Sequence, residues 1–149
     1  MLKSAEKRFR LATRDYAQLA SFRHALRGFL RFSELSAANE GLTSQHYQAM
    51  LVLRGWRDGE PVSIADLAQH LVIKHNSAVG LVNRLVNEGL VMREHSIVDR
   101  RKVELRFSPR GKMVLARLAA MHQGELRRIE PIMKGFFSDL AAPRGQGRD

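Results

Sequence analysis

The sequence predicts a mainly α-helical fold that contains one small antiparallel β hairpin. Apolar residues recur at three- and four-residue steps over most of the chain, as on the buried face of a helix. Between Gly89 and Ser108 the period changes to two, so that Val103, Leu105 and Phe107 alternate with Lys102, Glu104 and Arg106. This alternation is typical of a half-buried strand.

The composition is that of a small basic protein. The chain has 149 residues, enough for one domain with a single core. Its formal net charge is +10, from 25 Lys and Arg against 15 Asp and Glu, which indicates a polyanionic partner, either nucleic acid or an anionic membrane surface. There are no cysteines, which excludes disulfides, thiolate catalysis and zinc–cysteine sites.

Other classes are disfavoured by what the sequence does not contain. No apolar run reaches the roughly 18 residues of a membrane span, and the charged N-terminus does not have the apolar core of a secretory signal. We therefore expect a cytoplasmic protein with no membrane partner. No nucleophile–base pair, catalytic carboxylate pair or phosphate-binding glycine loop is evident, so we expect no catalytic residues, no enzymatic activity and no cofactor.

Two long helical segments are predicted near the ends of the chain. The first covers residues 14–37, and the second starts at Ser108-Pro109, a cap followed by proline, and continues to about residue 140. Pro131 must kink the second segment or divide it in two. Both segments are rich in large apolar residues that one small lobe can hardly cover, although a compact monomeric bundle is the alternative: Phe22, Phe29, Phe136 and Phe137.

Three shorter helices are predicted between the long ones. The first follows Thr43, a plausible N-cap, and the second opens with a capping box formed by Ser63 and Asp66. The third begins at about residue 75 and ends at Gly89, a residue suited to a helix C-terminus. The second and third helices form a helix-turn-helix, and with the hairpin that follows they make a winged helix.

The third short helix has the pattern of a DNA-recognition helix. Ala78, Leu81, Val82 and Leu85 must face the core. Such a helix fits the major groove of DNA, where asparagine and serine can bond base edges. A solvated polar face is the alternative, but asparagine is a poor helix former for a face without function. The helix residues predicted to contact DNA are His75, Asn76, Ser77, Gly80, Asn83 and Arg84.

Arg84 and the hairpin loop each leave two interpretations open. Arg84 either contacts the DNA backbone or anchors the helix locally. Asp99-Arg100-Arg101 is either a solvated turn or part of a wing whose arginines reach a narrow minor groove. In the wing interpretation one arginine enters the groove and the other pairs with Asp99, which is then structural. The sequence does not distinguish the two arginines.

Residues 42–111 resemble the MarR (multiple antibiotic resistance regulator) family of bacterial transcription factors. The resemblance rests on "LTSQHYQAMLVL", "VSIADLAQHLVI", "SAVGLVNRLVNEGLVMRE", "DRR" and "LRFSPRG", in that order. It implies an obligate homodimer. Residues 14–40 and 109–141 would form the dimerisation base, residues 42–108 the DNA-binding lobe, and residues 1–13 and 142–149 flexible ends.

The resemblance also implies a function, that of a sequence-specific repressor bound to a pseudo-palindromic operator. Many members begin the recognition helix with Ser or Thr where this chain has Lys74, which we predict to contact the DNA backbone. Similar proteins are released by a small aromatic or anionic ligand held between dimer base and DNA lobe. The residues expected near such a ligand are His24, His46, Tyr47 and Met113.

Three alternatives to that function remain. A nonspecific architectural DNA-binding protein would have the same net charge but little sequence discrimination. A winged helix used for protein contacts would have an apolar or acidic wing, whereas this one is basic. A metal-responsive regulator would use His24, His46 and His122, although no short metal-binding motif such as HExxH is present.

Overall fold

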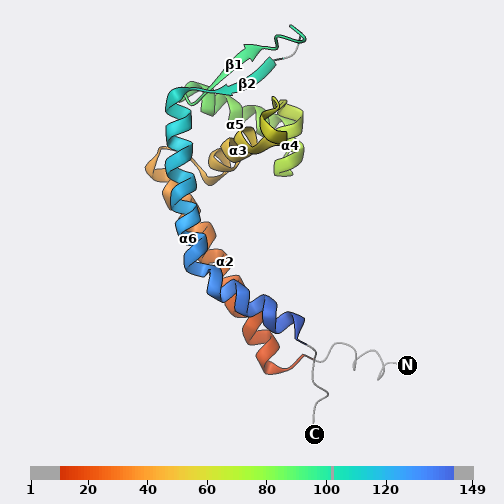
Figure 1. The fold of residues 1–149 in the computed structure, drawn as a ribbon, viewed down its shortest axis with the longest axis vertical. Helices are drawn as coiled ribbons and strands as arrows, with labels where there is room; N and C mark the ends of the chain where they lie inside the picture. The colour runs from red at the N-terminus through yellow and green to blue at the C-terminus, as the bar shows by residue number, and fades with distance from the viewer. Residues whose placement is uncertain (1–10, 102, 143–149) are drawn as a thin grey trace, which may run out of the picture. The chain divides into compact units, whose positions relative to one another are not determined.

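The computed structural model describes residues 11–101 and 103–142 and confirms the mainly α fold with one antiparallel hairpin (Figure 1). None of the described helices combines the length and apolar character needed to cross a lipid bilayer. In chain order the elements are α2 (Thr13–Asn39), α3 (Ser44–Gly55), the 3-10 helix η2 (Trp56–Gly59), α4 (Ile64–Leu71), α5 (His75–Asn87), β1 (Val91–His95), β2 (Val103–Phe107) and α6 (Pro109–Ala141).

The chain divides into two compact units. The central unit is Ser33–Gln123, and the terminal unit combines Met1–Phe32 with Gly124–Asp149. The central unit therefore holds α3, α4, α5 and the hairpin, together with the end of α2 and the first part of α6. The remaining parts of α2 and α6 form the terminal unit.

The core of the central unit lies where α3, α4 and α5 meet the hairpin and α6. Ala78, Leu81, Val82 and Leu85 are all buried, which confirms the predicted inward face of α5. Leu105 and Phe107 of β2 pack against the same core. Its largest fully buried side chains are Met50, Leu67, Leu85, Leu90, Leu118, Val62, Val82 and Val91.

Local capping determines where α3 and α4 begin and end. Thr43 and His46 form a capping box on α3, and Ser63 and Asp66 form the predicted one on α4. The turn into α5 passes through Val72, which adopts the left-handed conformation at φ 55°. A β-branched residue rarely adopts this conformation, at a cost of about 1–2 kcal/mol, so the tight turn of the helix-turn-helix is locally strained.

The hairpin has a register that places alternate residues on one face. Val91 pairs with Phe107, Arg93 with Leu105, and His95 with Val103. Val103 shares this face with Leu105 and Phe107, as the alternation predicted, but it is 48% exposed. Only the part of the inward face nearest α6 reaches the core, whereas Val103 pairs at the end of the hairpin next to its loop. Lys102 lies outside the described residues.

Ser108 joins three elements of the central unit. Its Oγ donates to the carbonyl of Gly89 at 2.6 Å and accepts from the amide of Gly111 at 2.9 Å, and its own amide donates to the carbonyl of Leu90 at 3.0 Å. Gly89 has φ 67° at the end of α5, the predicted C-terminal glycine position. The contacts therefore hold the end of α5, the start of β1 and the first turn of α6 together.

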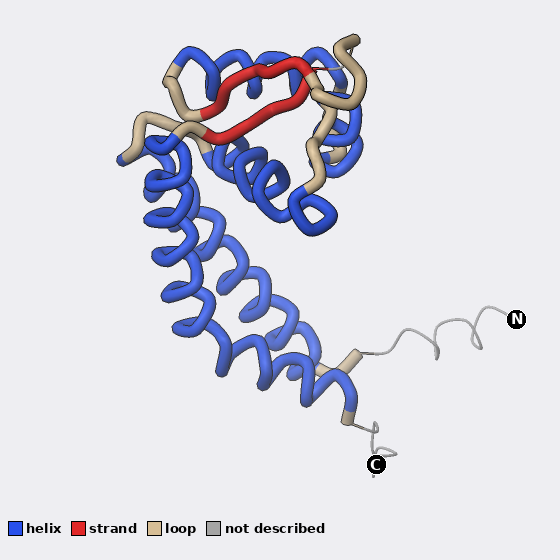
Figure 2. The backbone as a smooth tube through the Cα atoms, turned by 45° about the horizontal axis from the view of Figure 1, so that its top comes forward, coloured by secondary structure: helices blue, strands red, loops and turns tan. Residues whose placement is uncertain are grey.

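The terminal unit is a pair of helical segments (Figure 2). Phe22 of α2 stacks on Phe136 of α6 at 4.6 Å between ring centroids, and Gln18 Nε2 donates to Asp139 Oδ2 at 2.8 Å. α6 continues through Pro131 as one helix. Of the two predicted effects of this proline, division of the segment is therefore wrong.

The terminal unit buries few of its apolar side chains. Within its described residues, the only buried hydrophobic ones are Ala25 and Ile129. The alternative of a compact monomeric bundle would cover the apolar stripe of α2, but Leu19, Leu26 and Leu30 are 46%, 38% and 48% exposed. The two helical segments alone have too little surface to cover the apolar stripes of both α2 and α6.

Candidate nucleic-acid interface

The exposed face of α5 carries the residues predicted to contact DNA. Lys74 is the N-cap residue and its side chain makes no capping bond. The free amides and the dipole at this helix start favour an anion. The residues predicted to contact DNA are all exposed at or along this helix: Lys74, His75, Asn76, Ser77, Gly80, Asn83 and Arg84.

The side chains on this face differ in whether they have partners within the protein. Arg84 Nη2 lies 2.9 Å from Glu88 Oε1 and donates to the Gly41 carbonyl at 3.5 Å. Of the two interpretations of Arg84, the geometry therefore favours the local anchor. By contrast, the side chains of His75, Asn76 and Ser77 form no hydrogen bond or ion pair within the described part of the chain, and they are open to a ligand.

Asn83 has a partner that the sequence did not suggest. Its Oδ1 accepts a hydrogen bond from Arg93 Nη2 on β1. Arg93 shares the inward face of the hairpin with Leu105 and with the buried Val91. The alternation of the strand could have identified Arg93 as a functional residue. It places a cation at an inward-facing position, where the charge needs a partner or a ligand.

The hairpin loop is held by bonds from its own side chains. Ser96 Oγ accepts from the amides of Val98 and Asp99 at 3.2 and 3.3 Å. Asp99 Oδ1 accepts from the backbone amide of Arg101 at 3.0 Å and lies 3.6 Å from its Nε. These bonds give the loop a defined conformation.

The two loop arginines differ in their contacts. The Arg101 guanidinium is paired with Asp99. The Arg100 side chain is exposed, and within residues 11–101 and 103–142 it forms no hydrogen bond or ion pair. Only its backbone carbonyl is engaged, 3.1 Å from His95 Nδ1.

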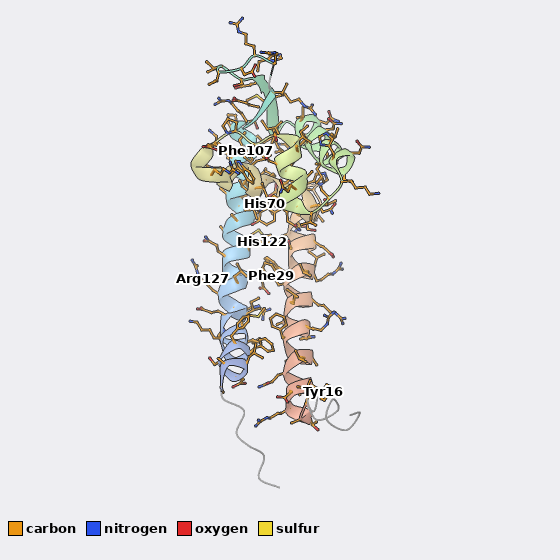
Figure 3. All side chains as sticks on the ribbon, turned by 90° about the vertical axis from the view of Figure 1, so that its right-hand side faces the viewer. Tyr16, Phe29, His70, Phe107, His122 and Arg127 are labelled. Carbon is orange, nitrogen blue, oxygen red and sulfur yellow. The ribbon has the colours of Figure 1, made fainter. Side chains whose placement is uncertain are left out.

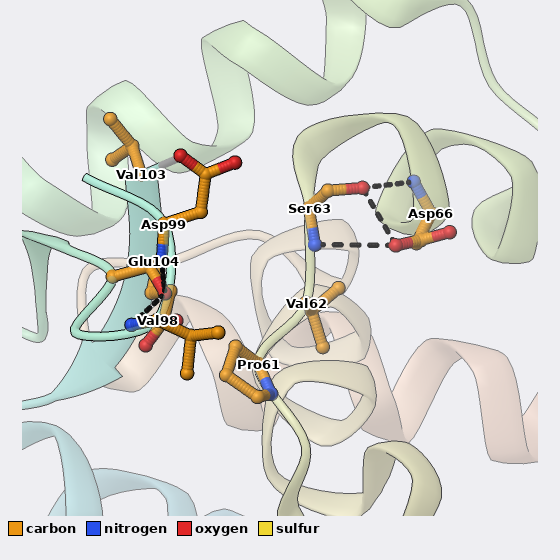
Figure 4. A pocket seen from close by; sticks show the side chains of 9 residues that line it. Pro61, Val62, Ser63, Asp66, Val98, Asp99, Val103 and Glu104 are labelled. Atoms are coloured by element: carbon orange, nitrogen blue, oxygen red, sulfur yellow. Dashed lines mark hydrogen bonds between the residues drawn. The ribbon is translucent and has the colours of Figure 1, made fainter. Parts of the chain in front are cut away.

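A cavity of about 620 Å³ lies between the start of α4 and the wing loop (Figure 4). Its three carboxylates all have partners. Asp66 Oδ2 accepts from Ser63 Oγ at 2.7 Å, a bond that lowers the pKa of the Asp66 carboxyl. Asp99 is paired with Arg101, and Glu104 lies 3.4 Å from Arg106 Nη2. Asp66 thus caps α4, Asp99 and Glu104 pair within the hairpin, and none of the three carboxylates is without a partner.

The residues expected near an effector are distributed over both units. His24 is exposed on α2 in the terminal unit, and Met113 is 59% exposed on α6 in the central unit. Tyr47 is 4% exposed and stacks on His122 at 4.1 Å. The Tyr47 ring is therefore packed, His46 is half-buried, and Met113 is the most accessible of the three candidates in the central unit.

The histidines do not form a metal site. His46 Nδ1 is bonded in the α3 capping box, 2.7 Å from Thr43 Oγ1. His122 is buried, with Nδ1 2.7 Å from the Leu118 carbonyl and Nε2 2.9 Å from Ser33 Oγ, and it points from α6 toward α2 in Figure 3. No three His, Cys, Asp or Glu residues in the described ranges are grouped to hold a metal ion. The metal-responsive alternative therefore has no support.

Comparison with known sequences identifies the family that this chain resembles. The MarR family profile matches residues 40–102. A proposed transcriptional regulatory protein for the hcr operon of Thauera aromatica is 30% identical over 105 residues, 69% of this chain and 61% of that protein. The HTH-type transcriptional repressor YetL of Bacillus subtilis is 26% identical over 102 residues, 68% of this chain and 59% of YetL. The chain thus spans about three fifths of the length of the curated relatives it matches.

Solved structures share the fold at lower sequence identity. A point mutant of MepR of S. aureus, bound to an oligodeoxyribonucleotide, superposes with a TM-score of 0.66 at 13% identity, covering 87% of this chain and 99% of MepR. CouR of Rhodococcus jostii RHA1, bound to p-coumaroyl-CoA, superposes with a TM-score of 0.62 at 19% identity, covering 84% of this chain and 92% of CouR.

Proposed function

The chain belongs to the MarR family of transcriptional regulators, and on this basis we propose that it is a sequence-specific DNA-binding repressor. It binds a pseudo-palindromic operator as a homodimer and is released by a small ligand. The observation that carries the proposal is the exposed start of α5, where His75, Asn76 and Ser77 have no side-chain partner among the described residues.

Base recognition is assigned to the first turns of α5. Recognition helices of this type contact base edges with their N-terminal residues, and here Asn76 and Ser77 offer both donors and acceptors. Gly80 allows close approach of the helix backbone. Lys74 lies at the helix start, where its charge and the free amides would together bind a phosphate.

The wing arginines are assigned different roles. Arg100 enters the minor groove, because its side chain is exposed and has no partner within the described residues. Arg101 braces the loop through Asp99, which it contacts with both its backbone amide and its guanidinium. Arginine is favoured in a narrow minor groove by the strong negative potential there.

The homodimer is supported by the terminal unit. Its helices expose large apolar side chains that a second copy would cover. Release by a ligand is supported by the structural neighbour CouR, which binds p-coumaroyl-CoA. The residues proposed to respond to a ligand are His24, His46, Tyr47 and Met113, and a small aromatic or anionic molecule is the class expected.

Selection of genomic fragments with the purified protein tests the function. We expect enrichment of a pseudo-palindrome with half-sites about one helical turn apart. If roughly 6–10 phosphates are neutralised, affinity falls about 10³–10⁵-fold between 50 and 200 mM salt. Binding without enrichment of any sequence would instead indicate a nonspecific architectural protein, and a flat salt dependence would argue against DNA as the ligand.

Two alanine variants separate the wing arginines on the selected duplex. Arg100→Ala lowers DNA affinity and leaves the melting temperature unchanged, because its side chain has no partner in the described protein. Arg101→Ala lowers both DNA affinity and melting temperature, because it removes the guanidinium that pairs with Asp99 and holds the loop. The reverse pattern would exchange the two roles.

A further inference from the structure

We infer that Asn83 and Arg93 form a phosphate clamp, a pair of side chains that contacts the DNA backbone and does not read bases. The inference rests on the proposed DNA-binding function. It adds Arg93 to the interface and changes the role of Asn83, whose position on the recognition helix suggested adenine recognition.

The bond between the two residues determines which groups remain open. Arg93 Nη2 donates to Asn83 Oδ1 at 2.5 Å. Asparagine reads adenine with its oxygen accepting from N6 and its nitrogen donating to N7. With Oδ1 facing the guanidinium, the Nδ2 group and the remaining N–H groups of Arg93 present only donors. A donor-only surface fits phosphate oxygens.

The charge of Arg93 makes this surface cationic. Several other arginines of the central unit are neutralised by carboxylates, such as Arg106 by Glu94 at 2.7 Å and Arg117 by Glu40 at 2.9 Å. Arg93 forms no ion pair with any carboxylate of the described residues, and both members of its pair are exposed. An anion brought to this point would meet an unneutralised guanidinium, a strong partner for phosphate.

The position of the pair favours phosphate over a base edge. Asn83 lies in the C-terminal half of α5 (His75–Asn87), and Arg93 is the middle residue of β1 (Val91–His95). Since the N-terminal residues of a recognition helix reach the bases, its later turns approach the rim of the groove where the phosphates lie. The pair therefore fixes the helix on the backbone while residues 76 and 77 read sequence.

Asn83→Asp is the decisive variant. The carboxylate keeps an acceptor for Arg93, so we expect the melting temperature to be maintained. The variant also removes the Nδ2 donors and places a negative charge against the phosphate. Affinity for a mixed-sequence 30-base-pair duplex should fall about 10- to 100-fold, the loss expected for a charge-assisted hydrogen bond.

Arg93→Ala and a matched control complete the experiment. Arg93→Ala should reduce the slope of log affinity against log salt by about one. Arg106→Ala removes the same charge from the same hairpin, but that guanidinium is already neutralised by Glu94 and Glu104, so its slope should stay close to that of the wild type.

The outcomes separate this inference from the proposed function. Wild-type affinity for Asn83→Asp would overturn the clamp, because a purely structural bond survives that change. A loss confined to the selected operator would also overturn it, in favour of base reading. A wild-type protein that binds the mixed-sequence duplex but selects no operator would contradict the repressor proposal and leave the clamp measurable on the same duplex. No binding to any duplex would overturn both.

Discussion

His46 illustrates how local bonding determines the chemistry of a single side chain. Its Nδ1 accepts from the Thr43 amide at 3.1 Å, completing the capping box of α3. A ring nitrogen that accepts a hydrogen bond carries no proton. Burial lowers the pKa of His46, and the nearby Arg84 lowers it further. Folding therefore favours the neutral imidazole.

Because the folded state favours the neutral imidazole of His46, we predict that the stability of the protein falls in acid. The His46 pKa is lower in the folded state than in the unfolded chain, where it is about 6.5. The unfolded chain takes up the proton first, so the stability contribution is complete above about pH 6.5 and is lost as pH falls toward the folded pKa. His46→Gln keeps an acceptor at this capping position but does not titrate.

Melting temperatures measured at about pH 7, 6 and 5 test this prediction. The decrease toward pH 5 should be smaller for His46→Gln than for the wild type, since the remaining histidines are common to both proteins. Equal pH dependence in the two proteins would show that His46 takes up its proton equally in both states.

At the scale of elements, the contact between α6 and β1 sets the position of the wing. A Cβ atom built on Gly111 would lie 1.9 Å from the carbonyl oxygen of Leu90. The backbones of the first turn of α6 and the start of β1 therefore approach closely, and Ser108 bonds both sides of this contact. Only glycine allows this approach.

Gly111→Ala should lower the free energy of unfolding by about 1–3 kcal/mol, the cost of overpacking a tight contact. Gly124→Ala on the same helix is the matched control, because a Cβ atom there meets nothing within 4 Å. It should stabilise the protein by about 0.5–1 kcal/mol, since alanine is the better helix former. Chemical denaturation measures both variants. Equal stability of Gly111→Ala and the wild type would contradict the close contact.

At the scale of the whole molecule, the terminal unit of a single chain leaves much of its apolar surface exposed. Within its described residues the large apolar side chains that stay substantially exposed come from both helices: Tyr16, Leu19, Leu26, Leu30, Leu126, Ile132, Phe137 and Leu140. So much apolar surface on a two-helix unit favours the proposed dimer, because the hydrophobic effect drives such surfaces together. In the proposed homodimer, a second copy of the same surface would cover these side chains with twofold symmetry.

Leu126→Glu should shift the protein from dimer to monomer. Leu126 is 48% exposed on α6, and a carboxylate there would be buried without a partner in the proposed interface. Met92→Glu, at a site 44% exposed on β1, is the matched control and should remain dimeric. Sedimentation at several concentrations distinguishes the two states. A dimeric Leu126→Glu protein would place the interface elsewhere.

The sequence by itself was sufficient to predict the helices, the hairpin and the buried face of the recognition helix. Helix periods, the Ser63–Asp66 capping box and the change of period after Gly89 depend on neighbours a few residues apart, which the sequence displays directly. The resemblance to the MarR family likewise rests on an ordered series of short segments. The DNA-contact and effector residues predicted in this way stay predictions.

Only the tertiary structure decided which side chains are paired. Arg93 meets Asn83 across 10 positions in the chain, and Ser108 meets Gly89 across 19. Arg101, and not Arg100, pairs with Asp99 because of the conformation of the loop. Such contacts depend on how elements pack and on the path of a turn, and neither follows from hydrophobic periodicity. The same holds for the exposed stripes of α2 and α6, whose periodicity predicts burial but does not specify the surface that covers them.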